Sequence, residues 1–176
     1  VPVVEEALTL DPTAPGLDAL AVDVLTRAGN WQRLRDLLEQ LFAAASGGDR
    51  AERALQLARL FAGPLADPTQ LGAWLDLAAK ADPARVGKSD AKLMQVDRLL
   101  MRNEDQAAAA LLTEVLRQLE EQRAADEIAV RSHQLGLLRE LLGDTEGALA
   151  AFARAHEIDG KNARNLLDYG RVLIAS

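Results

Sequence analysis

Turn residues recur at a regular interval along this 176-residue chain, and that interval constrains the fold more than any other feature. Pro83 comes 71 residues after Pro12, and Gly160 comes 77 residues after Pro83, each directly behind an aspartate. Each distance is two periods of about 35 to 39 residues, which is typical of stacked helical hairpins. The spacing therefore predicts an α-solenoid rather than a closed helical bundle.

The segments between the turns are rich in helix-forming residues. Ala and Leu make up roughly a third of the chain, whereas Val, Ile and Thr make up about a tenth and six residues are aromatic. Small and straight-chain residues favour helices, and β-branched and aromatic residues favour strands. The composition predicts an all-α protein, with N-caps at Asp67, Ser89 and Asp144. Apolar spacing places the helices at 3–10, 17–28, 31–45, 49–62, 68–81, 89–102, 104–121, 125–142, 145–158 and 162–175.

One stretch carries a more specific pattern, made of Leu135-Gly136, Leu142-Gly143-Asp144, Ala148, Phe152, Ala155 and Asp159-Gly160. This pattern resembles the tetratricopeptide repeat signature, in which small residues let two helices approach closely. Leu57-Ala58 and Tyr169-Gly170 match the same small-residue position in other units. The resemblance implies a single repeat domain with units at 1–12 (partial), 13–47, 48–83, 84–122, 123–160 and 161–176 (partial).

Tetratricopeptide arrays line a concave groove with the first helix of each unit, called the A helix, and place the second, or B, helix on the back. The resemblance implies that the groove residues come from the outward face of the A helices. A mixture of Arg and Leu there suits a peptide with acidic and apolar groups, while the alternative is a merely solvated face. The peptide-binding candidates are Arg59, His133, Leu137, Arg164, Leu167 and Arg171, and the same register adds Ala19, Asp23, Glu52 and Leu55.

No pattern in the sequence points to catalysis. His133 and His156 do not have metal-ligand spacing, there is no cysteine, and the glycines do not form a phosphate-binding loop. The acidic pairs are typical of solvated helix faces, and Trp31 and Trp74 are expected to pack between hairpins rather than to anchor a partner. We therefore expect no catalytic residue, no metal site and no cofactor.

The net charge and the hydropathy of the chain limit the kinds of partner that it is expected to bind. A net charge of −7 with few aromatic residues argues against nucleic-acid binding, including repeat-based RNA binding. No apolar run approaches the roughly 20 residues of a membrane span. The basic and amide clamp of chaperone-binding tetratricopeptide proteins is not matched, since Ala19, Leu20 and Asp23 stand at the corresponding positions.

We interpret the chain as a non-catalytic protein–protein interaction scaffold that binds a peptide or protein segment in the groove. The alternative is a spacer or self-assembly repeat region attached to a catalytic or regulatory domain outside this segment. Neither end has a polar capping helix, so we expect a segment of a longer array with a self-associating edge near Tyr169 and Leu173. We favour the cytoplasm and leave the periplasm open.

Overall fold

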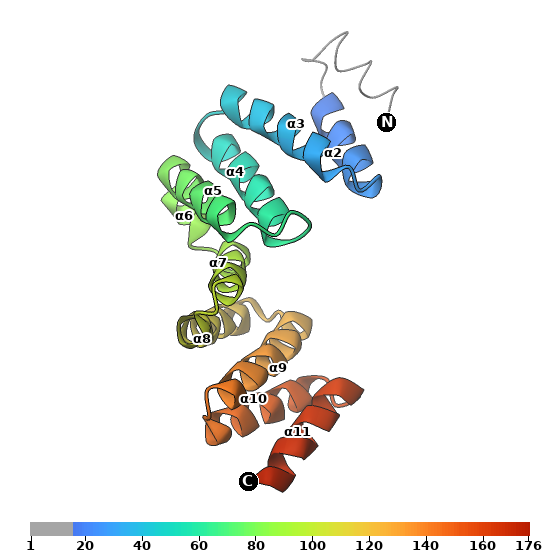
Figure 1. Ribbon diagram of the computed structural model, residues 1–176, viewed down its shortest axis with the longest axis vertical. Helices are drawn as coiled ribbons and strands as arrows, with labels where there is room; N and C mark the ends of the chain where they lie inside the picture. The colour runs from blue at the N-terminus through green and yellow to red at the C-terminus, as the bar shows by residue number, and fades with distance from the viewer. Residues whose placement is uncertain (1–15) are drawn as a thin grey trace. The chain divides into compact units, whose positions relative to one another are not determined.

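The computed structural model describes residues 16–176, and every regular element in that range is a helix (Figure 1). The all-α prediction is confirmed for these residues, and each helix predicted within 16–176 begins and ends within two residues of its observed bounds. The predicted helix at 3–10 and the partial unit at 1–12 fall outside the described residues. The helices are α2 (Leu17–Arg27), α3 (Trp31–Ala44), α4 (Gly47–Ala62), α5 (Pro68–Ala81), α6 (Pro83–Val86), α7 (Ser89–Met101), α8 (Asp105–Gln122), α9 (Ala125–Leu141), α10 (Thr145–Ile158) and α11 (Ala163–Ala175).

Side-chain caps fix several helix starts. Asp67 accepts hydrogen bonds from the backbone N–H groups of residues 69 and 70, and Asp144 accepts one from residue 147, so both predicted caps are confirmed. Ser89 is the first residue of α7, and its predicted role as the cap stays a prediction. Asn30 and Asn162 cap α3 and α11 in the same way.

The short helix α6 was not predicted. Asp82 ends α5 and at once caps the next turn, where its Oδ1 accepts hydrogen bonds from the N–H groups of Ala84 and Arg85. Pro83 occupies the first helical position, where its fixed φ suits a helix and its missing N–H costs nothing. This arrangement places Arg85 on a turn between α5 and α7.

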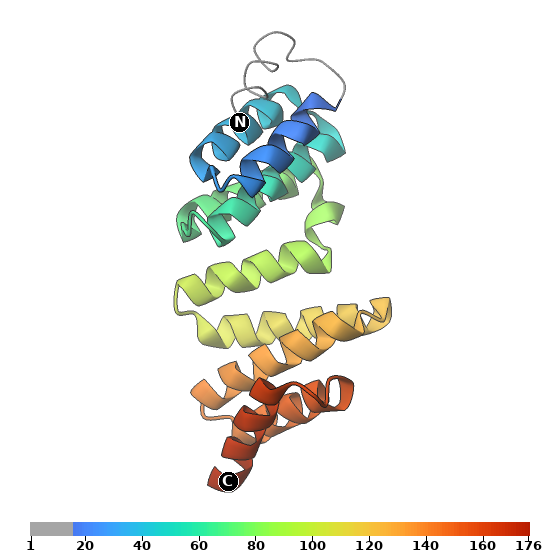
Figure 2. The same ribbon diagram turned by 90° about the vertical axis from the view of Figure 1, so that its right-hand side faces the viewer.

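The chain divides into two compact units, Val1–Met94 and Gln95–Ser176, with the division inside α7. In unit 1, α2 packs on α3, α3 on α4, and α4 on both α5 and α6. In unit 2, α8 packs on α9, α9 on α10, and α11 on both α10 and α9. Figure 2 shows α10 and α11 side by side at the C-terminal end of unit 2. Within each unit, helices therefore pack against near neighbours in the chain, as expected for hairpin repeats.

In unit 2 the core is centred on a close approach of α9 and α10. Phe152 on α10 is fully buried with Ala148 and with Val172 of α11. A Cβ added to Gly136 of α9 would lie 2.6 Å from the Phe152 ring, so the ring occupies the space that a side chain would need. Asn165 of α11, also buried, donates a hydrogen bond of 3.1 Å to the carbonyl of Phe152. The packing role expected for the small residue at 136 is confirmed.

The core of unit 1 contains the fully buried Leu57, Ala58 and Leu71. Trp74 of α5 meets Phe42 of α3 edge to face, with ring centroids 5.1 Å apart. This contact agrees with the expected packing role of Trp74, since aromatic pairs favour such T-shaped geometry.

Candidate interaction surface

The predicted repeat register assigns α2, α4, α7, α9 and α11 as the A helices. Polar contacts join α2 to α4 in unit 1 and α9 to α11 in unit 2. In unit 1, Arg53 of α4 contacts Asp18 of α2 at 2.5 Å. In unit 2, Nε2 of His133 on α9 lies 2.9 Å from Oδ2 of Asp168 on α11. The partners are 35 residues apart in both contacts, which is one repeat. Both contacts join neighbouring A helices, and we call the surface along these contacts the A-helix face.

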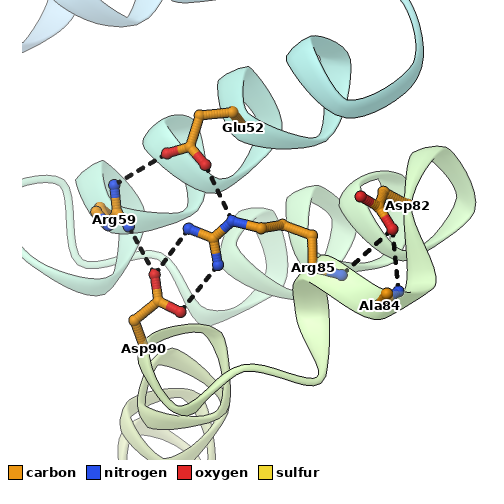
Figure 3. Close-up of polar contacts among 6 residues, drawn as sticks. All are labelled: Glu52, Arg59, Asp82, Ala84, Arg85 and Asp90. Carbon is orange, nitrogen blue, oxygen red and sulfur yellow. Dashed lines mark hydrogen bonds and ion pairs between the residues drawn. The ribbon is translucent and has the colours of Figure 1, made fainter.

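In unit 1 the A-helix face is a network of four charged groups (Figure 3). The Arg85 guanidinium donates to Glu52 at 3.1 Å and to both oxygens of Asp90 at 2.9 and 2.8 Å. Arg59 completes the network, 3.6 Å from Glu52 and 3.0 Å from Asp90. The hydrogen bonds from Arg85 hold the pKa of Asp90 below its ordinary value. The candidate Arg59 is thus held between two carboxylates.

In unit 2 the A-helix face has a second network, between α9 and α11. Arg171 donates to both carboxylate oxygens of Glu140, one at 2.8 Å, and to Asp168 at 3.3 Å. Burial alone would raise the pKa of Asp168, but hydrogen bonds from His133 and Arg171 lower it below its ordinary value. The His133 ring also lies against Phe152, with centroids 5.6 Å apart. The contacts of His133 and Arg171 therefore stabilise the packing of α11 on α9.

The remaining candidates differ in their surroundings. Leu137 packs at the edge of the Phe152 cluster and is half-buried. Leu167 is 74% exposed, and Arg164 is exposed and forms no ion pair within residues 16–176. Ion pairs thus restrain Arg59 and Arg171, whereas Arg164 and Leu167 face solvent.

The same register also predicted groove positions for four further residues, and the structure places them differently. These residues are Ala19, Asp23, Glu52 and Leu55. Leu55 was expected on the groove and is wrong there, because its side chain is fully buried in unit 1. Glu52 belongs to the Arg85 network, Asp23 pairs with Arg27 of its own helix at 3.0 Å, and Ala19 is exposed.

Two exposed apolar residues on α9 were missed by the sequence reasoning. Val130 is 57% exposed and Leu141 is 69% exposed, and they lie seven residues before and four residues after Leu137. That spacing places all three on one side of the helix. We call Val130, Leu137 and Leu141 the α9 stripe. The available signal was the 3–4 spacing itself, but α9 is apolar on several sides and the stripe resembled core.

An open cleft of about 440 Å³ lies between α3 and α4 of unit 1. Its α3 side is apolar and its α4 side is polar, and Glu52 and Arg53 of the A-helix face belong to it. The lining residues are Leu41, Ala44, Ala45, Asp49, Glu52, Arg53 and Gln56.

Residues 16–176 also bear on two other kinds of site, metal-binding and membrane-spanning. No group of three or more His, Asp or Glu residues in that range is arranged to hold a metal ion. No helix in the same range combines the length and apolar character needed to cross a membrane.

Comparison with known proteins identifies the fold. No family model matches the sequence, and no curated protein matches it. Two solved structures, titled as the crystal structures of MamA and of MamA protein, are similar with TM-scores of 0.69 and 0.66. They are 17% and 18% identical in sequence, cover 88% and 86% of this chain, and are themselves covered over 83% and 76% of their length.

MamA is a helical-repeat solenoid of the tetratricopeptide type. The likeness confirms the predicted fold class, an α-solenoid of antiparallel helical hairpins. Membership of the tetratricopeptide family and the bounds of the individual repeats stay predictions.

Proposed function

We propose that this chain is a non-catalytic scaffold that binds a segment of a partner protein on the A-helix face of unit 2. The supporting observation is the exposure of large apolar side chains on the two helices that form this face, namely Val130 and Leu141 of α9 and Leu167 of α11. Contiguous exposed apolar groups bordered by polar ones are typical of interaction sites. The charged border here consists of His133, Asp168, Arg171 and Glu140.

The ion pairs have a physical role in this proposal. Arg171 and His133 hold α9 and α11 together, so the scaffold loses little conformational freedom when a partner binds. The charges of Arg171 and Arg59 are already balanced by carboxylates. Arg164 has no such partner within the described residues and supplies a guanidinium for a carboxylate of the bound segment. The expected ligand is therefore a segment with apolar residues and at least one acidic residue.

The test is selection of short random peptides displayed on phage against the immobilised chain. We expect enriched peptides to bind at least about tenfold more weakly to the double variant Val130→Asp/Leu141→Asp, a change of about 1.4 kcal/mol. Leu20→Asp is the matched control, because Leu20 of α2 is 51% exposed and lies in the other unit. The Leu20→Asp variant is expected to bind the enriched peptides as tightly as the unchanged chain does.

Arg164→Ala tests the charged contact separately. Removal of an exposed guanidinium should weaken binding at low salt and have less effect at high salt, since the interaction is screened. The combined variant Arg164→Ala/Arg171→Ala should lose more binding affinity than Arg164→Ala alone, because Arg171 also positions α11 against α9. Failure to enrich any peptide, or equal binding to the Asp variants, would reject the proposal and favour the alternative of a spacer or self-assembly region.

A further inference from the structure

Asp97 of α7 is a half-buried carboxylate of unit 2 that has no hydrogen-bond partner within residues 16–176. Burial raises the pKa of this carboxyl above its ordinary value, so the charged form is costly in the folded chain. Arg131 of α9 attracts the carboxylate but donates no hydrogen bond to it. A charge that is kept at a cost and left without a partner is a candidate for an interaction outside the chain.

The position of Asp97 on its helix carries paired charges on two other A helices. Asp97 lies four residues before the end of α7, and Asp23 and Arg171 lie four residues before the ends of α2 and α11. Asp23 pairs with Arg27 at 3.0 Å, and Arg171 pairs with Glu140 at 2.8 Å. Of these three charged groups, Asp97 has no such partner in the part of the chain that the structure describes.

The same position on α9 is that of Leu137, a member of the α9 stripe, four residues before Leu141 at the helix end. Equivalent residues of neighbouring units face the same side of a repeat array. At the other end of the stripe, Val130 directly precedes Arg131, the residue that attracts Asp97. Asp97 is therefore placed beside the apolar surface of α9.

The Arg131 guanidinium is hydrogen-bonded within its own helix. Its Nε donates to Glu127 at 2.9 Å, and one terminal nitrogen donates to Gln134 at 3.1 Å. Because Glu127 already balances the charge of Arg131, the Asp97 carboxylate stays available to a second cation. A lysine or arginine side chain suits this place, since its charged end pairs with a carboxylate and its aliphatic stem packs on apolar surface.

We propose that Asp97 binds a lysine or arginine side chain of the partner segment that lies on the α9 stripe. This inference rests on the function proposed above and specifies the ligand further. The segment has a basic residue toward α7, apolar residues over α9 and an acidic residue toward Arg164 of α11. The exposed Val130 accepts the aliphatic stem of the basic residue. Its charge removes the cost of an unpaired, half-buried carboxylate.

Parallel selections from one random peptide library displayed on phage test the assignment. The immobilised targets are the unchanged chain, Asp97→Asn and the control Asp76→Asn, which removes an exposed carboxylate of α5 in unit 1. We expect peptides selected on the unchanged chain and on Asp76→Asn to carry Lys or Arg at a constant distance from their apolar residues. Peptides selected on Asp97→Asn should lack that preference.

A double-mutant cycle with one selected peptide then tests for direct contact. Asp97→Asn in the chain, and replacement of the basic residue of the peptide by Gln, should each weaken binding at least about fivefold in fluorescence anisotropy. The two changes together should weaken binding no more than either one alone, because both remove the same contact. Since burial disfavours the charged carboxyl, Asp97→Asn is expected to fold at least as stably as the unchanged chain, which circular dichroism checks.

Two results would overturn this inference and leave the proposed function standing. The first is a set of peptides whose binding is lost in Val130→Asp/Leu141→Asp but is equal for Asp97→Asn and the unchanged chain. The second is a cycle in which the two losses multiply, because the basic residue would then contact another group. If no peptide is selected on the unchanged chain, the proposed function is rejected, and this inference is rejected with it.

Discussion

Gly136 and Gly170 occupy equivalent places on α9 and α11 but have different surroundings. Because the Phe152 ring fills the space beside Gly136, Gly136→Ala should destabilise the protein by about 1–3 kcal/mol through overpacking. Gly170→Ala meets no neighbour and should stabilise it by up to about 1 kcal/mol through helix propensity. Urea unfolding of both variants measures the difference. Equal urea midpoints for the two variants would show that the Phe152 ring shifts to accommodate the added methyl group at no cost in stability.

Asp97 on α7 is expected to oppose folding at neutral pH. Burial raises the pKa of its carboxyl, and Arg131 offsets this only in part. A raised pKa in the folded state means that the folded chain binds more protons, so the contribution of Asp97 to stability falls as pH rises from its ordinary pKa through the raised one. Above the raised pKa, Asp97 is charged in the folded chain, and the full free-energy cost of burying that charge destabilises the fold.

Asp97→Asn should therefore raise the free energy of unfolding at pH 7 and have little effect near pH 3, because the carboxyl is then protonated in both states. Thermal unfolding across this pH range makes the measurement. Asp76→Asn is a control on an exposed carboxylate of α5. If Asp97→Asn destabilised the protein at pH 7, the attraction to Arg131 would outweigh the burial.

Among the helices, two starts with different cap chemistry allow a direct comparison. Asp67 accepts hydrogen bonds of 2.9 and 3.0 Å from the first turn of α5, whereas Ser46 precedes α4 without a side-chain cap bond. Asp67→Ala should cost about 1 kcal/mol of stability, and Ser46→Ala should cost much less. Chemical denaturation distinguishes them, and similar losses would show that the Asp67 bonds are not maintained in solution.

The limits of sequence reasoning also fall at the level of elements. Helix bounds were predictable because caps, Gly and Pro act locally, whereas α6 has four residues and no apolar period to detect. Arg85 was missed because its partner Glu52 lies 33 residues away in the chain, so their contact depends on tertiary packing. Leu55 was misplaced because a register read from motifs does not fix which of two adjacent helix faces is covered.

In the whole molecule, the segment 84–104 contains the division between the two units, and it ends in Asn103-Glu104 where the repeat pattern of unit 123–160 has Gly143-Asp144. We expect its amides to show the fastest hydrogen exchange among the internal segments, since local stability follows local packing and the four alanines at 107–110 offer little side-chain volume. Mass-spectrometric exchange of the unchanged chain tests this. Uniform protection across all internal helices would contradict it.

Hydrogen exchange also tests whether the stability of the chain is a sum of contributions from neighbouring helices. Phe152 belongs to the core of unit 2, and Leu71 belongs to the core of unit 1. Phe152→Leu should therefore speed exchange in α9, α10 and α11 and leave α4 and α5 unchanged, while Leu71→Ala should do the reverse. The reciprocal variants control for one another, because each destabilises a core of the same chain. If either substitution lowered protection equally in both units, the chain would unfold as one cooperative block, and the nearest-neighbour account of this solenoid would be wrong.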